Sequence, residues 1–168
     1  MAIFLFSTTA CQNTSSTDQT LELATFIENK VEVTISTSRD ENGQTLLLAT
    51  FTPQDASLHL YSKDIPRGGV DGLGRPTLLE LTAQSQMKAA GKLSENVAAQ
   101  IPDFEPKDLL VYPAGKVTLT LPITLPEGND WVDDEISVTY MACSDTGCRA
   151  PVIDKIIPNP ARHSEFSF

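Results

Sequence analysis

The amino-acid sequence predicts an all-β protein, an antiparallel sandwich of two sheets. Short segments of alternating apolar and polar residues recur along the 168-residue chain, and turn-forming residues separate them at spacings of about 8–12 residues. No regular alternation of strands and helices is visible, so parallel strands joined by crossover helices are not expected. The length suits a single domain with its own core.

Three strands are predicted between residues 31 and 62. Apolar and polar residues alternate over residues 31–36, which is typical of a strand with one buried face. Turn-forming residues at 40–43 separate this segment from a second predicted strand over residues 46–51. A third strand is predicted over residues 57–62.

Four more strands are predicted further along the chain. They cover residues 77–81, 116–125, 134–142 and 152–157. The segment 116–125 has the strongest strand pattern of the sequence. It contains Pro122, which has no amide hydrogen to donate, and this predicts a position at a sheet edge or at a bulge.

Two segments depart from the strand pattern. Residues 82–100 have the only marked helical character, although Gly91 weakens it. Residues 66–76 form a long loop with four glycines. This loop lacks the Lys-Ser/Thr ending of a phosphate-binding loop and leads into a strand rather than a helix, so nucleotide binding is not expected.

The charge of the chain excludes one class of partner. Twelve Lys and Arg residues stand against 22 Asp and Glu residues, for a net charge of -10. The basic residues are scattered, and an acidic surface repels a phosphate backbone, so nucleic-acid binding is not expected. No segment has the roughly 18 consecutive apolar residues that a membrane-spanning helix needs.

The first 20 residues have the features of an export signal and a tether. A short apolar run over residues 2–6 is followed by small residues and Cys11, and then by polar residues without periodicity. This arrangement resembles a bacterial lipoprotein signal, in which the cysteine is lipidated. We therefore expect a periplasmic or cell-envelope protein that contacts the membrane only through a lipid on Cys11. Residues 21–158 are expected to form the β-sandwich domain, and residues 159–168 a disordered tail.

Side chains suited to hydrolysis or metal binding are sparse. Nucleophilic hydrolysis needs a histidine base, and the two histidines are His59, in a predicted strand, and His163, in the polar tail. Both are expected to be structural or solvated. The acidic residues at 133–135, and the pair Asp103 and Glu105, are expected to lie in solvated loops. We expect no metal and no other cofactor.

Two cysteines near the C-terminus bracket a turn. Cys143 and Cys148 enclose Ser-Asp-Thr-Gly, and four intervening residues allow the chain to reverse and the sulfurs to approach within disulfide distance. Three roles are open at this point. A structural bridge would close a very small loop, worth about 2 kcal/mol, and half of a zinc site would lack a second ligand pair. A redox pair on an exposed turn would keep both sulfurs accessible.

The charges beside the two cysteines differ. Arg149 adjoins Cys148 and would favour its thiolate, whereas Asp145 lies two residues from Cys143 and would disfavour a negative charge there. Cys148 is therefore predicted to be the better attacking thiol.

Three segments resemble the N-terminal periplasmic domain of the thiol:disulfide interchange protein DsbD family. The most specific is the strand, two-cysteine turn and proline over residues 138–151. Residues 116–123 resemble the strand that precedes this motif in the family, and residues 58–65 resemble its Leu-Tyr-x-Lys-x-Ile segment. Together the segments span about residues 44–157 in the family's order.

The resemblance implies an immunoglobulin-like sandwich in which Cys143 and Cys148 cycle between dithiol and disulfide. It also implies that Cys148 forms the mixed disulfide with thioredoxin-fold redox proteins or a membrane electron donor. In the family a cap loop with an aromatic residue shields the pair, and Phe104 or Tyr112 would supply that residue here. Arg149 replaces an aromatic or leucine of the family pattern, so the surface offered to the partner is expected to differ.

Two functions therefore follow as expectations from the sequence. The first is an exported thiol–disulfide exchange module without metal, nucleotide or flavin. The second is a non-catalytic binding or structural sandwich in which the bridge between Cys143 and Cys148 only pins a hairpin.

Overall fold

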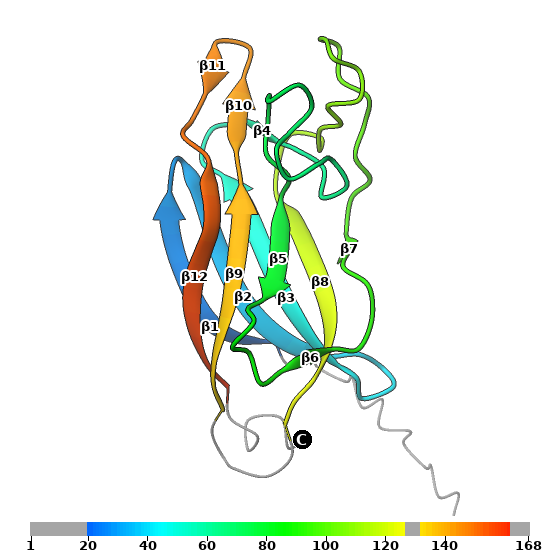
Figure 1. Ribbon diagram of the computed structural model, residues 1–168, viewed down its shortest axis with the longest axis vertical. Helices are drawn as coiled ribbons and strands as arrows, with labels where there is room; N and C mark the ends of the chain where they lie inside the picture. The colour runs from blue at the N-terminus through cyan, green and yellow to red at the C-terminus, as the bar shows by residue number, and fades with distance from the viewer. Residues whose placement is uncertain (1–19, 127–131, 162–168) are drawn as a thin grey trace, which may run out of the picture.

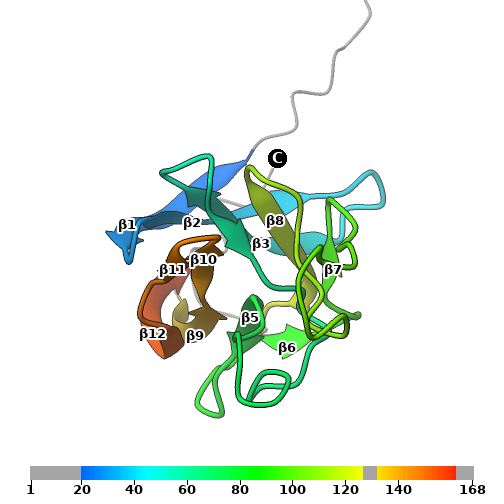
Figure 2. The same ribbon diagram turned by 90° about the horizontal axis from the view of Figure 1, so that it is seen from above.

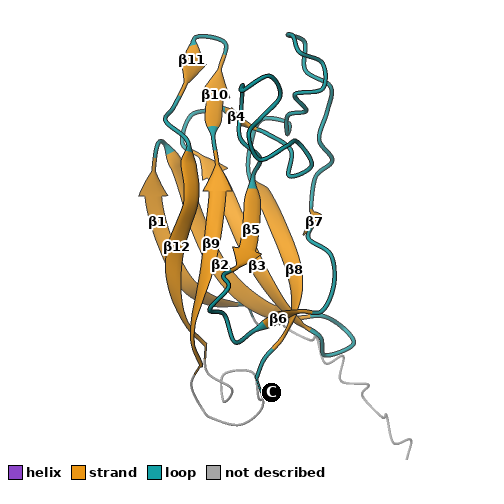
Figure 3. Ribbon diagram, viewed as in Figure 1, coloured by secondary structure: helices purple, strands orange, loops and turns teal. Residues whose placement is uncertain are grey.

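The chain folds into an antiparallel β-sandwich, which a computed structural model describes over residues 20–126 and 132–161 (Figures 1 and 3). These residues contain 12 strands and no helix, so the predicted all-β class is confirmed and the arrangement is consistent with an immunoglobulin-like sandwich. No helix among them is long and apolar enough to cross a membrane. Cys11 and His163, for which a lipid anchor and a solvated tail were predicted, lie outside the described residues.

The larger sheet contains six strands. Its order is β1-β2-β3-β8-β6, with β7 also paired to β8. The strands are β1 (Leu21–Glu28), β2 (Val31–Arg39), β3 (Thr45–Pro53), β6 (Lys88–Ala89), β7 (Ser94–Glu95) and β8 (Val117–Thr124). Alternate residues of β2, β3 and β8 are fully buried, which is the period-two pattern that predicted these strands.

The second sheet covers the buried face of the first (Figure 2). It has three strands in the order β12-β9-β5, namely β5 (Leu78–Leu81), β9 (Val132–Tyr140) and β12 (Val152–Ala161). The core between the sheets includes Phe51 of β3 and Tyr140 of β9, whose rings meet edge to face at 5.5 Å between centroids. Strand β12 continues to Ala161, beyond the predicted domain end at residue 158.

A third, small sheet extends the sandwich at one end. It consists of β4 (His59–Leu60), β10 (Ala142–Ser144) and β11 (Gly147–Cys148), in the order β11-β10-β4. The loop over residues 62–77 and the segment leading to residue 111 lie at the same end of the molecule (Figure 1). This end carries the two cysteines and is therefore where a site can form.

The helical prediction for residues 82–100 was wrong. The segment contains the short strands β6 and β7, both paired with β8. Its first part is held by Asp134, a buried residue of β9 whose Oδ2 accepts the amide hydrogens of Gln86 at 3.0 Å and Met87 at 2.8 Å. A partner about 48 residues away in sequence therefore overrides local helix propensity. The prediction of solvated carboxylates at 133–135 was wrong for Asp134, because its side chain is buried and accepts these two amide hydrogens.

Pro122 lies at the end of a ladder. It is the last residue of β8 paired with β3, opposite Leu46, while the next two residues pair with β6 on the other side of the strand. The Pro122 carbonyl accepts the Ala90 amide hydrogen at 2.8 Å, so the nitrogen without a hydrogen also faces the side of β6 and β7. It lies between the residues paired with β7 and those paired with β6, where the missing donor is tolerated.

Candidate functional site

A disulfide joins Cys143 and Cys148 across the β10–β11 hairpin. The two residues are direct cross-strand partners, with 4.0 Å between their Cα atoms and 2.02 Å between their sulfur atoms. The Arg149 amide donates to the Ala142 carbonyl at 2.8 Å, one step nearer the sandwich. The cysteines therefore occupy the adjacent pair without backbone hydrogen bonds, where side chains on facing strands approach most closely.

The two sulfur-bearing residues differ sharply in exposure. Cys143 is 2% exposed because its strand, β10, is the central strand of the small sheet. It packs in a satellite cluster with Tyr61, Ile65 and Leu109. Cys148 lies in the outer strand β11 and is solvent-exposed. A second protein can therefore reach Cys148 directly and Cys143 only through it.

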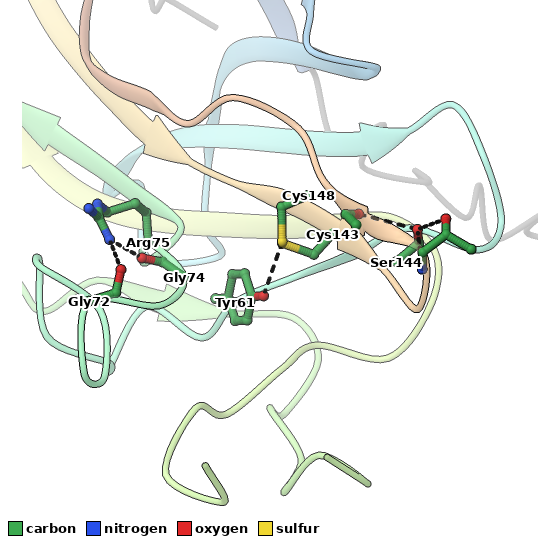
Figure 4. Close-up of a disulfide and its surroundings, with 9 residues drawn as sticks. Tyr61, Gly72, Gly74, Arg75, Cys143, Ser144 and Cys148 are labelled. Carbon is green, nitrogen blue, oxygen red and sulfur yellow. Dashed lines mark hydrogen bonds between the residues drawn. A yellow bond between two sulfur atoms is a disulfide. The ribbon is translucent and has the colours of Figure 1, made fainter. Parts of the chain in front are cut away.

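Two aromatic residues, His59 of β4 and Tyr61 just after it, lie beside the disulfide. His59 of β4 is the cross-strand partner of Cys143, and its ring meets that of Tyr61 edge to face at 5.4 Å between centroids. The Tyr61 Oη lies 4.0 Å from the Cys148 Sγ, as Figure 4 shows. Because a disulfide sulfur carries no hydrogen, Tyr61 is the donor of this contact.

Tyr61 was missed by the sequence analysis. It lies in the segment 58–65 that resembles the DsbD family, but no spacing rule connects it with a cysteine 87 residues away. The expected strand over 57–62 is shorter than predicted. Only His59 and Leu60 belong to β4, and Tyr61 makes single bridges to Pro76 and Val111.

The two residues proposed for a cap lie in different places. The Phe104 ring stacks on His59 at 5.7 Å between centroids and is 37% exposed. Tyr112 is 1% exposed, belongs to the main core, and accepts the Lys63 amide hydrogen at its Oη. Of the two, only Phe104 lies at the surface and contacts a residue that flanks the disulfide.

Burial controls the ionisation of the aromatic neighbours. Desolvation raises the pKa of Tyr61, so its hydroxyl stays protonated and remains a donor at neutral pH. Desolvation also lowers the pKa of His59, against an opposing attraction from Asp145, and this favours the neutral imidazole. The Nε2 of His59 is buried and has no hydrogen-bond partner among the described residues.

Three charged residues considered from the sequence, Asp103, Glu105 and Arg149, lie at the surface. Within residues 20–126 and 132–161, no cluster of His, Cys, Asp or Glu could hold a metal ion. Glu105, which was expected in a solvated loop, is exposed and pairs with Lys107 at 3.7 Å. Arg149 is exposed and contributes to a lowered pKa of Asp55, although that shift arises first from hydrogen bonds to Ser57.

Comparison with known proteins gives similarity at the level of structure. No protein-family model and no curated protein matches the sequence. Among solved structures, the reduced N-terminal domain of DsbD from Neisseria meningitidis matches 69% of this chain and 77% of its own length. The sequence identity is 13% and the TM-score is 0.45.

Proposed function

We propose that this protein is a thiol–disulfide exchange module that passes electrons between redox proteins through Cys143 and Cys148. The observation that carries the proposal is the unequal exposure of the two cysteines, with Cys148 at the surface and Cys143 2% exposed. An exchange pair needs one accessible sulfur for the partner and a second sulfur close to it that can resolve the intermediate. The sequence resemblance to the DsbD family supports the same assignment.

The exchange is balanced in thiols and electrons. A thiolate of a reduced partner attacks the Cys148 Sγ, which forms a mixed disulfide and releases the Cys143 sulfur as a thiolate that takes up a proton. The partner's second thiolate then attacks the partner's first sulfur, which is bonded to the Cys148 Sγ in the mixed disulfide, and releases Cys148 as a thiolate. The partner ends as a disulfide and this chain as a dithiol, so two electrons have moved. The reverse sequence passes them to an oxidised acceptor.

The partners and the compartment are part of the proposal. Thioredoxin-fold proteins or a membrane electron donor would supply and receive the electrons, in the periplasm or cell envelope. A lipid on Cys11 would hold the domain near the membrane. Disulfides persist in such oxidising compartments.

A trapping experiment tests the roles of the two cysteines. Both variants carry Cys11→Ser, and one adds Cys143→Ser while the other adds Cys148→Ser. Each is mixed with a thioredoxin that retains one active-site cysteine, activated as its thionitrobenzoate disulfide. We expect Cys143→Ser to release thionitrobenzoate and form a mixed disulfide, and Cys148→Ser to do so far more slowly. Equal reactivity of the two variants would contradict the proposal.

The reduction potential separates this function from the alternative of a structural bridge. A value well below about -300 mV is typical of a bridge that cellular thiols do not reduce. We expect a higher value, in the range of exchange proteins, from equilibration with glutathione mixtures. A value below that limit would favour the structural sandwich.

A further inference from the structure

The glycine-rich loop over residues 66–76 is a folded unit that organises itself around Arg75. The Arg75 guanidinium donates to the carbonyl oxygens of Gly68 at 2.8 Å and Gly72 at 3.1 Å, and also to that of Gly74. Three loop carbonyls thus share one cation, and Figure 4 shows two of these contacts close to the disulfide. The glycines and the arginine of this loop therefore have a structural role, and no bound phosphate is needed to explain them.

One glycine of this loop fits directly against Tyr61. Gly74 is buried and has a φ of 71°, and a Cβ added there would lie 3.3 Å from both Tyr61 Cδ atoms and 2.7 Å from a Leu109 methyl carbon. A side chain at this position would have to displace one of the two neighbouring side chains. The absence of a side chain at Gly74 is therefore what allows the Tyr61 ring its present place.

The residue that follows the loop, Thr77, holds the backbone of the same tyrosine. Thr77 is 0% exposed, and its hydroxyl and amide both donate to the Tyr61 carbonyl, at 2.7 Å and 3.2 Å. Tyr61 is thus fixed at its main chain by Thr77 and at its ring by Gly74. Its hydroxyl, at the far end of the ring, is the group that reaches the Cys148 Sγ.

We propose that the glycine-rich loop is a positioning element that aims the Tyr61 hydroxyl at the Cys148 sulfur, so that Tyr61 stabilises the Cys148 thiolate. This inference rests on the proposed function and deepens it. In the disulfide the 4.0 Å contact is a weak one. When the partner's second thiolate breaks the mixed disulfide, the electron pair of the broken S–S bond stays on Cys148. A hydrogen bond to this anion is stronger than one to a neutral sulfur. The same bond lowers the pKa of Cys148 in the reduced protein.

The thiolate fraction of Cys148 in the reduced protein is the direct readout. It is obtained from the rate of iodoacetamide alkylation of Cys148 against pH, with the modified peptide identified by mass spectrometry. We expect Tyr61→Phe to raise the pKa of Cys148 and to slow alkylation about tenfold at neutral pH, since a hydrogen bond to a charged group is lost. Tyr140→Phe is the matched control, because it removes the hydroxyl of another buried tyrosine, whose partner is the Glu28 carbonyl.

A pair of glycine variants tests the role of the loop. Gly74→Ala and Gly72→Ala both place a side chain at a positive φ, 71° and 81°, and share that backbone cost. Only at Gly74 does the new Cβ meet Tyr61, whereas at Gly72 it meets nothing within 4 Å. We expect Gly74→Ala to raise the pKa of Cys148 and Gly72→Ala to leave it unchanged, with both proteins folded by circular dichroism.

The outcomes separate this inference from the proposed function. If Tyr61→Phe leaves the pH midpoint of Cys148 alkylation unchanged, the tyrosine has no role at the sulfur and the inference fails. If Tyr61→Phe shifts the midpoint but Gly74→Ala does not, the loop is not the positioning element. Should Gly74→Ala not fold, Arg75→Gln replaces it, because this variant removes the cation that the loop carbonyls share. An unchanged pH midpoint of Cys148 alkylation in Arg75→Gln would likewise show that the loop is not the positioning element. Alkylation needs no partner, so the inference can hold even where the trapping experiment above fails.

Discussion

Reduction of the Cys143–Cys148 disulfide should leave the protein folded and only modestly less stable. The bridge joins residues five apart in sequence, and the chain-entropy estimate for so small a loop is about 2 kcal/mol. The reduced hairpin keeps other restraints. Strand β10 still pairs with β4, the Arg149 amide still donates to Ala142, and the buried Cys143 side chain still packs in its cluster.

Urea denaturation of the oxidised and reduced protein measures this difference. We expect the free energy of unfolding to fall by about 2 kcal/mol on reduction, with an unchanged dependence on urea, because the same surface is exposed on unfolding. The variant with both Cys143→Ala and Cys148→Ala, treated with the same reductant, controls for effects of the reductant itself. An unfolded reduced protein, or a loss above about 5 kcal/mol, would refute the reasoning, since closing so small a loop cannot contribute a stabilisation of that size.

Three further predictions address the surroundings of the site and the core. Phe104→Ala should speed reduction of the disulfide by dithiothreitol several-fold, because its ring covers His59 beside Cys143; Ile101→Ala, at a position 70% exposed, should not, and equal rates would argue against a shielding role. Asp134→Ala should lower the free energy of unfolding by about 3 kcal/mol in urea denaturation, because the amides of residues 86 and 87, of which only Met87 is a buried residue, lose their acceptor. A loss under about 1 kcal/mol would mean that water replaces the carboxylate. Burial lowers the pKa of His59 below its ordinary value of 6.5, so the unfolded state binds a proton more readily than the folded state. The free energy of unfolding should therefore fall as the pH drops from about 6.5 towards the lower pKa of His59 in the folded state. His59→Gln should flatten that part of the stability curve, and an unchanged curve would assign the slope to other groups.

Several strands could be predicted because their evidence is local. Strands β2, β3 and β8 each bury alternate residues, and the alternation is visible in the sequence without knowledge of their neighbours. The short strands β6 and β7 could not be found this way. They exist because β8 offers its free edge to them and because Asp134 fixes the preceding turn.

The site was only partly predictable for the same reason. Cys143 and Cys148 are close in sequence, so the turn between them indicates that they can pair. Their ranking by neighbouring charges was an inference from Arg149 and Asp145 alone. The structure adds a different cause of asymmetry, because β10 is a central strand and β11 an outer one.

An all-β chain and a pair of thiols around one turn can be inferred from the sequence, since period-two patterning and short spacing are local properties. The surroundings of these thiols depend on the folded chain. The fold buries one cysteine and exposes the other, and it brings Tyr61 to Cys148 across 87 residues with Gly74 against the tyrosine ring. Such contacts depend on the packing of loops from separate parts of the chain, and no pattern within a single segment encodes them.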